Sequence, residues 1–232
     1  MEKLSLCRRP LLPGLSGSAL KVIAVLSMVT DHCAYYLMSH GTWLYEVMRC
    51  FGRIAFPVFA FLVAEGFAHT KDRMKYSLSL LCFAVVSELP WYLLNGNDGT
   101  HNVLFTLALG VVALAVFEGM KERLLWAVVA VLSLAGLATW LGVDYEWRGV
   151  LMIAMFYLLR CKQGSNPNID HRTLQLLCTF PLMMHYGMVG ALLACFILLL
   201  YNGQRGFIHG KVAKYGFYAF YPSHLFLLWT VL

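Results

Sequence analysis

Ionisable side chains stand inside several long apolar stretches of this chain, where charged groups are rare. They are Lys21, Asp31, His32, Arg53, Glu65, Glu88 and His224. Burying an isolated charge in hydrocarbon is costly, so such groups usually face one another or a cavity. A histidine in this setting can accept and return a proton. These residue types therefore predict proton-transfer chemistry inside a membrane.

The spacing of Lys21 and His32 favours a long ligand. The two residues are eleven positions apart, almost three helical turns, so they share one helix face with about 16 Å of rise between them. An anionic head group would stay beside Lys21 while the rest of the ligand reached His32. Asp31 points roughly 100° away from His32 on the same helix. Glu88, from another segment, is the alternative group that could orient the imidazole.

Two further places carry candidate groups. Tyr221 and His224 are three residues apart and can touch on a helix. Pro222 removes a backbone donor beside them, so one backbone carbonyl in the last apolar segment lacks its helical hydrogen bond. Glu65 stands apart near the cytoplasmic end of its segment, where it either binds a ligand or lies at the membrane interface.

Several candidates also have purely structural explanations. Arg53 could hold helices together through an ion pair with Glu88 or Asp31 instead of binding a ligand. His32 could be a packing histidine, and Lys21 could extend its amine to the lipid head groups. The place of His32 beside a carboxylate in an apolar stretch favours function.

The composition predicts an all-α, polytopic integral membrane helical bundle. Hydrophobic residues make up 60% of the chain and charged residues only 13%, whereas soluble domains contain about 25% charged residues. A hydrocarbon core of roughly 30 Å takes about 20 helical residues to cross, and long unbroken apolar runs favour helices over a barrel. About nine transmembrane helices are expected, at residues 19–38, 50–68, 76–94, 102–117, 124–141, 147–159, 173–184, 187–201 and 214–232.

The distribution of basic residues predicts the orientation of this bundle. With nine crossings, the clusters of Lys and Arg all fall on one face, which the positive-inside rule makes cytoplasmic. The amino terminus is then cytoplasmic and the carboxyl terminus outside. Joining 173–201 into one crossing would put a basic loop outside, so two crossings are favoured. Residues 1–232 are expected to form a single membrane-embedded domain, with 1–18 as a cytoplasmic amino-terminal segment.

Charge and cysteine usage narrow the functional classes. The net charge of +6 is explained by orientation and contact with anionic lipids rather than by nucleic-acid binding. The seven cysteines are scattered without zinc-type spacing, so neither a structural metal nor disulfides are expected. A P-loop, a GxGxxG fingerprint and the HxxxxD signature of soluble acyltransferases are all absent from the sequence.

A set of motifs in fixed order resembles the TraX family. The motifs are LKVIAVLSMVTDH, GRIAFPVFAFLVAEGFAHT, SELPW, HNVLFTLALG and YGFYAFYPSHLFLL. The resemblance runs from about Leu20 to the end and is weakest between 118 and 213. The family consists of bacterial inner-membrane proteins typified by the acetylase of conjugative F pilin. It is similar in turn to the transmembrane acyltransferases, whose catalytic histidine on the first helix corresponds to His32 and whose basic residue near the start of that helix corresponds to Lys21.

The resemblance implies transfer of an acetyl or other acyl group from cytoplasmic acyl-CoA to an amine or hydroxyl acceptor at the membrane or the outer face. His32, Asp31 and His224 are the candidate catalytic residues. His32 would act as a general base or form an acyl-histidine, and both routes stay open. The candidate substrate-binding residues are Lys21, Arg53, Glu65, Glu88, Lys71, Arg73, Lys75 and Tyr221.

The implied partners follow from this chemistry. Acyl-CoA is a substrate rather than a permanently bound cofactor, and the acceptor is a pilin-like peptide, a glycan or another small molecule. Membrane lipids surround the protein, and self-association into a homo-oligomer is left open. The alternative function is a proton-coupled transporter or flippase that uses the same buried groups as a relay. Against it, the sequence has no evident internal repeat of the kind found in many transporters.

Overall fold

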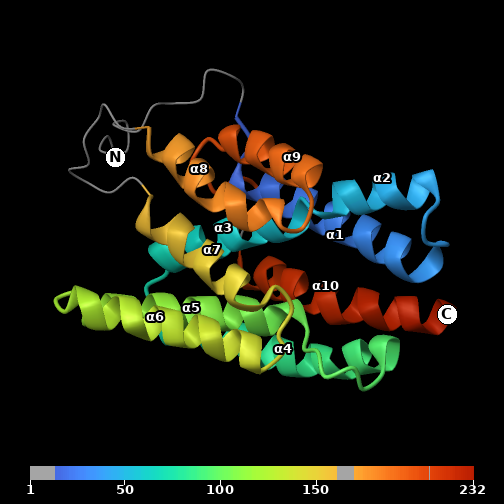
Figure 1. Ribbon diagram of the computed structural model, residues 1–232, viewed down its shortest axis with the longest axis horizontal. Coiled ribbons are helices and arrows are strands. Elements are labelled where there is room, and N and C mark those ends of the chain that lie inside the picture. Colours follow the sequence, from blue (N-terminus) through green and yellow to red (C-terminus); the bar gives the residue numbers. More distant parts are fainter. Residues whose placement is uncertain (1–13, 161–169, 209) are drawn as a thin grey trace. The chain divides into compact units, whose positions relative to one another are not determined.

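The computed structural model describes residues 14–160, 170–208 and 210–232, and most of these residues are helical (Figure 1). The only β-structure among them consists of two isolated bridges. The predicted all-α class is therefore confirmed. The helices are α1 (Gly17–Leu37), α2 (Trp43–Gly52), α3 (Ala55–His69), α4 (Arg73–Asn95), α5 (Val103–Met120), α6 (Leu124–Trp140), α7 (Glu146–Leu158), α8 (His171–Met184), α9 (Met188–Leu199) and α10 (Gly210–Val231).

Each predicted apolar segment corresponds to a helix, and α2 is an addition. The expected segment began at residue 50, whereas the helical chain begins at Trp43 and turns at Arg53 before α3. The sequence pattern missed α2 because its apolar residues share a short helix with Glu46 and Arg49. The segment 173–201 forms two helices, as expected, because the chain turns at Gly187, whose φ of 136° favours glycine.

Several helices are apolar enough to cross a membrane. By length and composition, α1, the combined stretch Trp43–His69, α4 and α5 meet this requirement, while α6 and α9 are apolar but shorter. Large apolar side chains such as Val85 and Leu89 on α4 are exposed. Exposed apolar faces of this kind are unusual on a soluble monomer. The structure thus supports a membrane protein.

The chain divides into two compact units, which we describe separately. Unit 1 comprises residues 1–62 and 155–208, and unit 2 comprises residues 63–154 and 209–232. The expectation of a single domain over 1–232 stays a prediction.

Unit 1 has an aromatic core joined to polar anchors. The Phe61 ring meets the rings of Phe156 and Tyr201 edge to face, at centroid distances of 5.4 and 5.2 Å. Arg172 lies 4.9 Å from the ring centroids of both Phe61 and Tyr201. Gln175, from α8, donates to the backbone oxygen of Phe156 in α7 at 2.5 Å. These contacts hold α3, α7, α8 and the chain just after α9 together.

Unit 2 is built around α4 and α5. Helix α5 packs against both α4 and α6, and Gly110 lets the Ile153 side chain approach α5 closely. Helix α10 packs against α4, with the Phe83 ring 5.4 Å from the Tyr218 ring. The two helices run in the same direction (Figure 1). Their starts therefore lie at the same end of unit 2.

Candidate functional site

A buried ion pair joins α1 to α2 in unit 1. The Arg49 Nη1 atom lies 2.5 Å from Asp31 Oδ2, and the two side chains are only 17% and 15% exposed. Ser27, one turn before Asp31, donates to the backbone oxygens of Phe51 at 2.7 Å and Gly52 at 3.1 Å. A side chain at Gly52 would collide with Asp31. The glycine thus permits the close approach that buries the pair.

The sequence left open whether Arg53 pairs with Glu88 or Asp31 or binds a ligand. Asp31 pairs with Arg49 rather than with Arg53, which instead packs its aliphatic carbons near Gly187 before α9 and Gly190 in the first turn of α9. The other carboxylate oxygen of Asp31 is buried and has no hydrogen-bond partner among the described residues. The Arg49 guanidinium also lies 5.1 Å from the Tyr35 ring centroid.

His32 occupies the neighbouring face of α1. It is half-buried, and its ring meets the Tyr36 ring at 6.1 Å. Because α1 is helical without interruption from Gly17 to Leu37, Lys21 and His32 keep the common face and the rise of about 16 Å expected from their spacing. Met28 is buried between them. The structure therefore places a cation and an imidazole along one side of an apolar helix.

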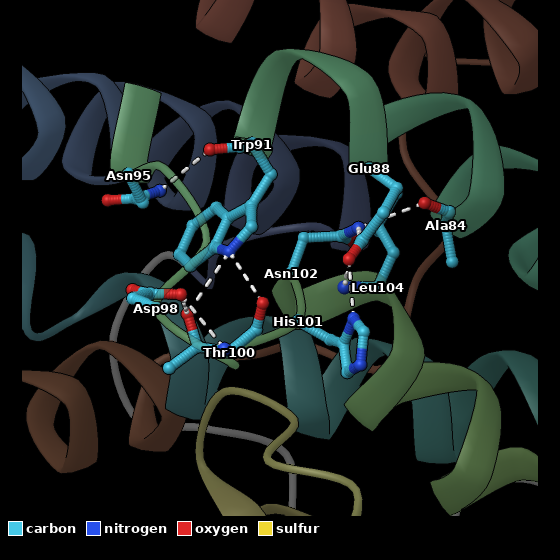
Figure 2. A network of polar contacts seen from close by, with 9 residues as sticks. All are labelled: Ala84, Glu88, Trp91, Asn95, Asp98, Thr100, His101, Asn102 and Leu104. Atoms are coloured by element: carbon cyan, nitrogen blue, oxygen red, sulfur yellow. Dashed lines mark hydrogen bonds and ion pairs between the residues drawn. The ribbon is translucent and has the colours of Figure 1, made fainter. Parts of the chain in front are cut away.

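A second polar cluster joins α4 to the start of α5 in unit 2. Figure 2 shows the Glu88 carboxylate between the His101 ring and the Asn102 amide. His101 Nδ1 forms a short hydrogen bond with Glu88 Oε1, and Asn102 Nδ2 donates to Glu88 Oε2 at 2.7 Å. Asn102 is fully buried, donates also to the Ala84 carbonyl at 2.9 Å, and caps α5 by accepting from the Leu104 amide.

The backbone around His101 is held from the other side by the chain after α6. The His101 amide donates to the Gly142 carbonyl at 3.0 Å, and the Asp144 amide donates to the His101 carbonyl at 2.9 Å. Trp91 Nε1 donates to Thr100, which is itself bonded to Asp98 (Figure 2). A carboxylate that holds one imidazole nitrogen in this way leaves the other nitrogen to exchange protons.

Basic residues gather where α4 and α10 begin. Arg73 reaches Glu118 at 4.0 Å, and Lys75 pairs with Asp72 at 2.9 Å. Hydrogen bonds from the Lys75 side chain and backbone lower the pKa of Asp72 below its ordinary value, so this helix cap stays ionised. Lys71 is exposed. The predicted trio Lys71, Arg73 and Lys75 is therefore partly neutralised by acidic neighbours.

Lys214 adds a cation to this end of unit 2. Its amine lies 5.9 Å from the Tyr76 ring centroid and 5.6 Å from those of Tyr215 and Tyr218. Cations are attracted to the faces of aromatic rings at such distances. We use "basic rim" for Lys71, Arg73, Lys75 and Lys214.

The remaining candidates also lie in unit 2. Tyr221 and His224 touch, with ring centroids 5.4 Å apart, as their spacing predicts. His224 Nδ1 lies 3.1 Å from the Phe220 carbonyl, and its ring stacks on the Phe220 ring. Glu65 is half-buried near the end of α3. The predicted site residues thus fall in both units: Lys21, Asp31, His32 and Arg53 in unit 1, and the others in unit 2.

Sequence reasoning did not select Arg49, His101, Asn102 or Lys214 as site residues. Arg49 and Lys214 carry no local signal, because their partners come from other helices. His101 and Asn102 did carry a local signal in the sequence. A histidine followed by a good helix-capping residue, just before an apolar run, places the imidazole at a helix start.

Comparison with known proteins identifies the family. The model of a family described as TraX protein matches residues 16–232. The chain belongs to the TraX family. The resemblance that the motifs predict is therefore confirmed over nearly the whole chain.

Two curated relatives extend this finding. A probable fimbrial assembly protein of Dichelobacter nodosus is 33% identical over 233 residues, covering 92% of this chain and 94% of the relative. An uncharacterized protein of Rickettsia prowazekii is 28% identical over 153 residues, covering 65% of this chain and 57% of the relative. No solved structure matches the chain.

Proposed function

We propose that this TraX-family protein is a membrane-embedded acyltransferase. It moves an acetyl or other acyl group from cytoplasmic acyl-CoA to an amine or hydroxyl group at the outer face. The observation that carries the proposal is the uninterrupted α1, which keeps Lys21 and His32 on one face about 16 Å apart. That distance suits a ligand whose phosphates stay at the cytoplasmic surface while its thioester lies within the membrane.

The chemistry assigned to His32 is proton transfer or acyl transfer. As a general base, its imidazole takes the proton of the acceptor while the amine or hydroxyl attacks the thioester carbon, and CoA leaves as the thiol. As a nucleophile, it forms an acyl-histidine with release of CoA, and the acceptor then attacks that intermediate. Arg53, in the same unit as His32, would stabilise the oxyanion in either route.

The relative from Dichelobacter nodosus bears on the acceptor. Its name refers to fimbrial assembly. A pilin-like subunit is therefore the first acceptor to test, ahead of a glycan or another small molecule. The amino group of such a subunit would provide the nucleophile.

We place the protein in the bacterial inner membrane with its amino terminus in the cytoplasm. Helices α8 and α9 contain 14 and 12 residues, so each rises only about 20 Å and covers part of a core of roughly 30 Å. The two helices either cross the membrane separately or enter it and return as a hairpin. In both cases α10 starts on the same side of the membrane as α8. The common direction of α4 and α10 supports this arrangement.

A reporter fused to the carboxyl terminus is therefore expected to be active only outside the cytoplasm. Cys7 and Cys161, which lie outside the described residues, should react with impermeant thiol reagents only from the cytoplasmic side. Both results can be measured in spheroplasts and inverted vesicles. A reporter that is active in the cytoplasm would mean one crossing fewer between α7 and α10.

Acyl-CoA binding is expected to depend on the basic rim. Each exposed ion pair contributes about 0.2–1 kcal/mol. A triple variant in which glutamine replaces Lys71, Arg73 and Lys75 should therefore bind CoA roughly tenfold more weakly. Adding Lys214→Gln should weaken CoA binding further, because this amine has no acidic partner among the ion pairs of the described residues. The difference should shrink at high salt, which screens exposed charges. If the variants and the wild type bind CoA with equal affinity at low salt, the nucleotide binds elsewhere, near Arg123 or Arg160.

The experiment that tests the proposed function uses acetyl-CoA carrying a labelled acetyl group. Purified protein in detergent is incubated with the donor and an envelope extract, and covalently bound label is followed by gel electrophoresis and mass spectrometry. The proposal expects label on an envelope component only when both protein and donor are present. Movement of a substrate without covalent label would favour the proton-coupled transporter instead.

A further inference from the structure

The cluster at the α4–α5 junction has the form of a proton-accepting site. Glu88 holds His101 Nδ1, and Asn102 holds the second oxygen of Glu88. The His101 side chain remains 44% exposed and that of Glu88 32% exposed. No hydrogen bond to His101 Nε2 is found among the described residues. One imidazole nitrogen is therefore fixed, and the other faces outward.

We propose that His101 is a further catalytic residue, the general base that takes the proton of the acceptor in the route in which His32 forms the acyl-histidine, and that Glu88 is its positioning residue. This inference rests on the proposed acyltransferase function. In the neutral imidazole, one nitrogen carries hydrogen and the other accepts. The Glu88 carboxylate is an acceptor, so it selects the tautomer with hydrogen on Nδ1 and leaves the lone pair on Nε2.

A purely structural role would use these groups differently. Asn102 alone already ties α4 to α5, because it bonds Ala84 and Glu88 and caps α5. The His101 main chain is likewise fixed by Gly142 and Asp144 without its ring. The contact between α4 and α5 is thus made without the imidazole. The imidazole is nevertheless the group in the cluster that a carboxylate holds at one nitrogen and that leaves the other nitrogen exposed.

Other carboxylates lie on the chain segments near the His101 cluster. Besides Glu88, the nearby chain carries Asp98 before α5, Asp144 after α6 and Glu146 at the start of α7. Glu146 is paired with Arg148 at 3.2 Å.

The proposed step is balanced without any further reagent. His101 Nε2 takes the proton from the amine or hydroxyl of the acceptor as that atom bonds to the acyl carbon. The bond from the acyl carbon to its leaving group then breaks, and Nε2 returns the proton to the leaving group. The leaving group is the His32 imidazole, because CoA has already left as the thiol when the acyl-histidine formed. The products of the step are the acylated acceptor and free His32.

The experiment compares His101→Ala and Glu88→Gln with wild type in the labelled acetyl-CoA assay. General-base loss lowers rates by about 10²–10⁴-fold, so the His101→Ala rate should fall by at least a hundredfold while its KM for acetyl-CoA stays unchanged. Added imidazole should restore part of the rate, which a structural defect would not allow. His69→Gln is the matched control: His69 bonds the Glu65 backbone carbonyl at the end of α3 and should transfer at the wild-type rate.

A folded His101→Ala protein with the wild-type rate, or with a loss that imidazole does not restore, would overturn the inference. If His101→Ala does not fold, Glu88→Gln decides the matter, because it keeps the shape of the side chain. Its kcat should fall tenfold or more at constant KM, and an unchanged kcat would overturn the inference. Absence of transfer by the wild-type protein would overturn the proposed function itself, so the two failures are distinguishable.

Discussion

Replacing His32 with alanine is expected to abolish acyl transfer while the protein stays folded and still binds acyl-CoA. His32 shares a face of α1 with Lys21 and corresponds to the catalytic histidine of the similar acyltransferases. Loss of a general base lowers the rate by roughly two to four orders of magnitude. The measurement is single-turnover transfer of labelled acetyl groups, with thermal unfolding and CoA binding recorded on the same preparation.

The control for His32→Ala is His40→Ala. His40 lies exposed in the turn between α1 and α2, where its ring meets Tyr35 and Tyr45. The control should transfer at the wild-type rate. A tenfold loss in His32→Ala would be too small for a catalytic base. A fully active variant would refute the mechanism and leave His101 and His224 as the candidate bases.

Breaking the Asp31–Arg49 pair is expected to have the largest effect on stability. Removing one partner leaves the other charge buried and uncompensated, which typically costs about 3–5 kcal/mol. Arg49→Gln should therefore destabilise the protein strongly, and the double variant Asp31→Asn with Arg49→Gln should recover much of the loss. The free energy of unfolding can be measured by denaturant titration in detergent. Glu46→Gln, at an exposed position of the same α2, is the control and should have little effect.

The variant Asp31→Asn also separates structure from chemistry. Asp31 faces Arg49 and lies roughly 100° around α1 from His32. The Asp31→Asn protein should therefore be less stable and keep most of its turnover. Equal losses in the single and double variants would contradict a stabilising pair. Loss of turnover with unchanged stability would instead place Asp31 in the reaction.

Much of the fold follows from the sequence, because apolar runs identify membrane helices almost independently of their partners. Helix α2 is the exception. Its ten residues mix Trp43 and Phe51 with Glu46 and Arg49, so neither length nor hydropathy marks it as a span.

The pairing between helices is the part that sequence spacing could not predict. Asp31 and His32 were identified as buried ionisable residues, but nothing local distinguishes Arg49 from Arg53 as the partner of Asp31. The close approach depends on Gly52 lying against α1. Glu88 and His101 likewise meet because the loop between α4 and α5 folds back, and their separation in the sequence does not reveal this.

The most direct test of acyl transfer across the membrane uses proteoliposomes and acetyl-CoA with one label on the acetyl group and another on the adenine. The donor is added on the side of the basic rim, and a pilin-like peptide is enclosed on the other side. The acyltransferase account predicts that the acetyl label appears covalently on the peptide while the adenine label stays where it was added. Both labels crossing together, or neither label leaving the donor, would contradict it.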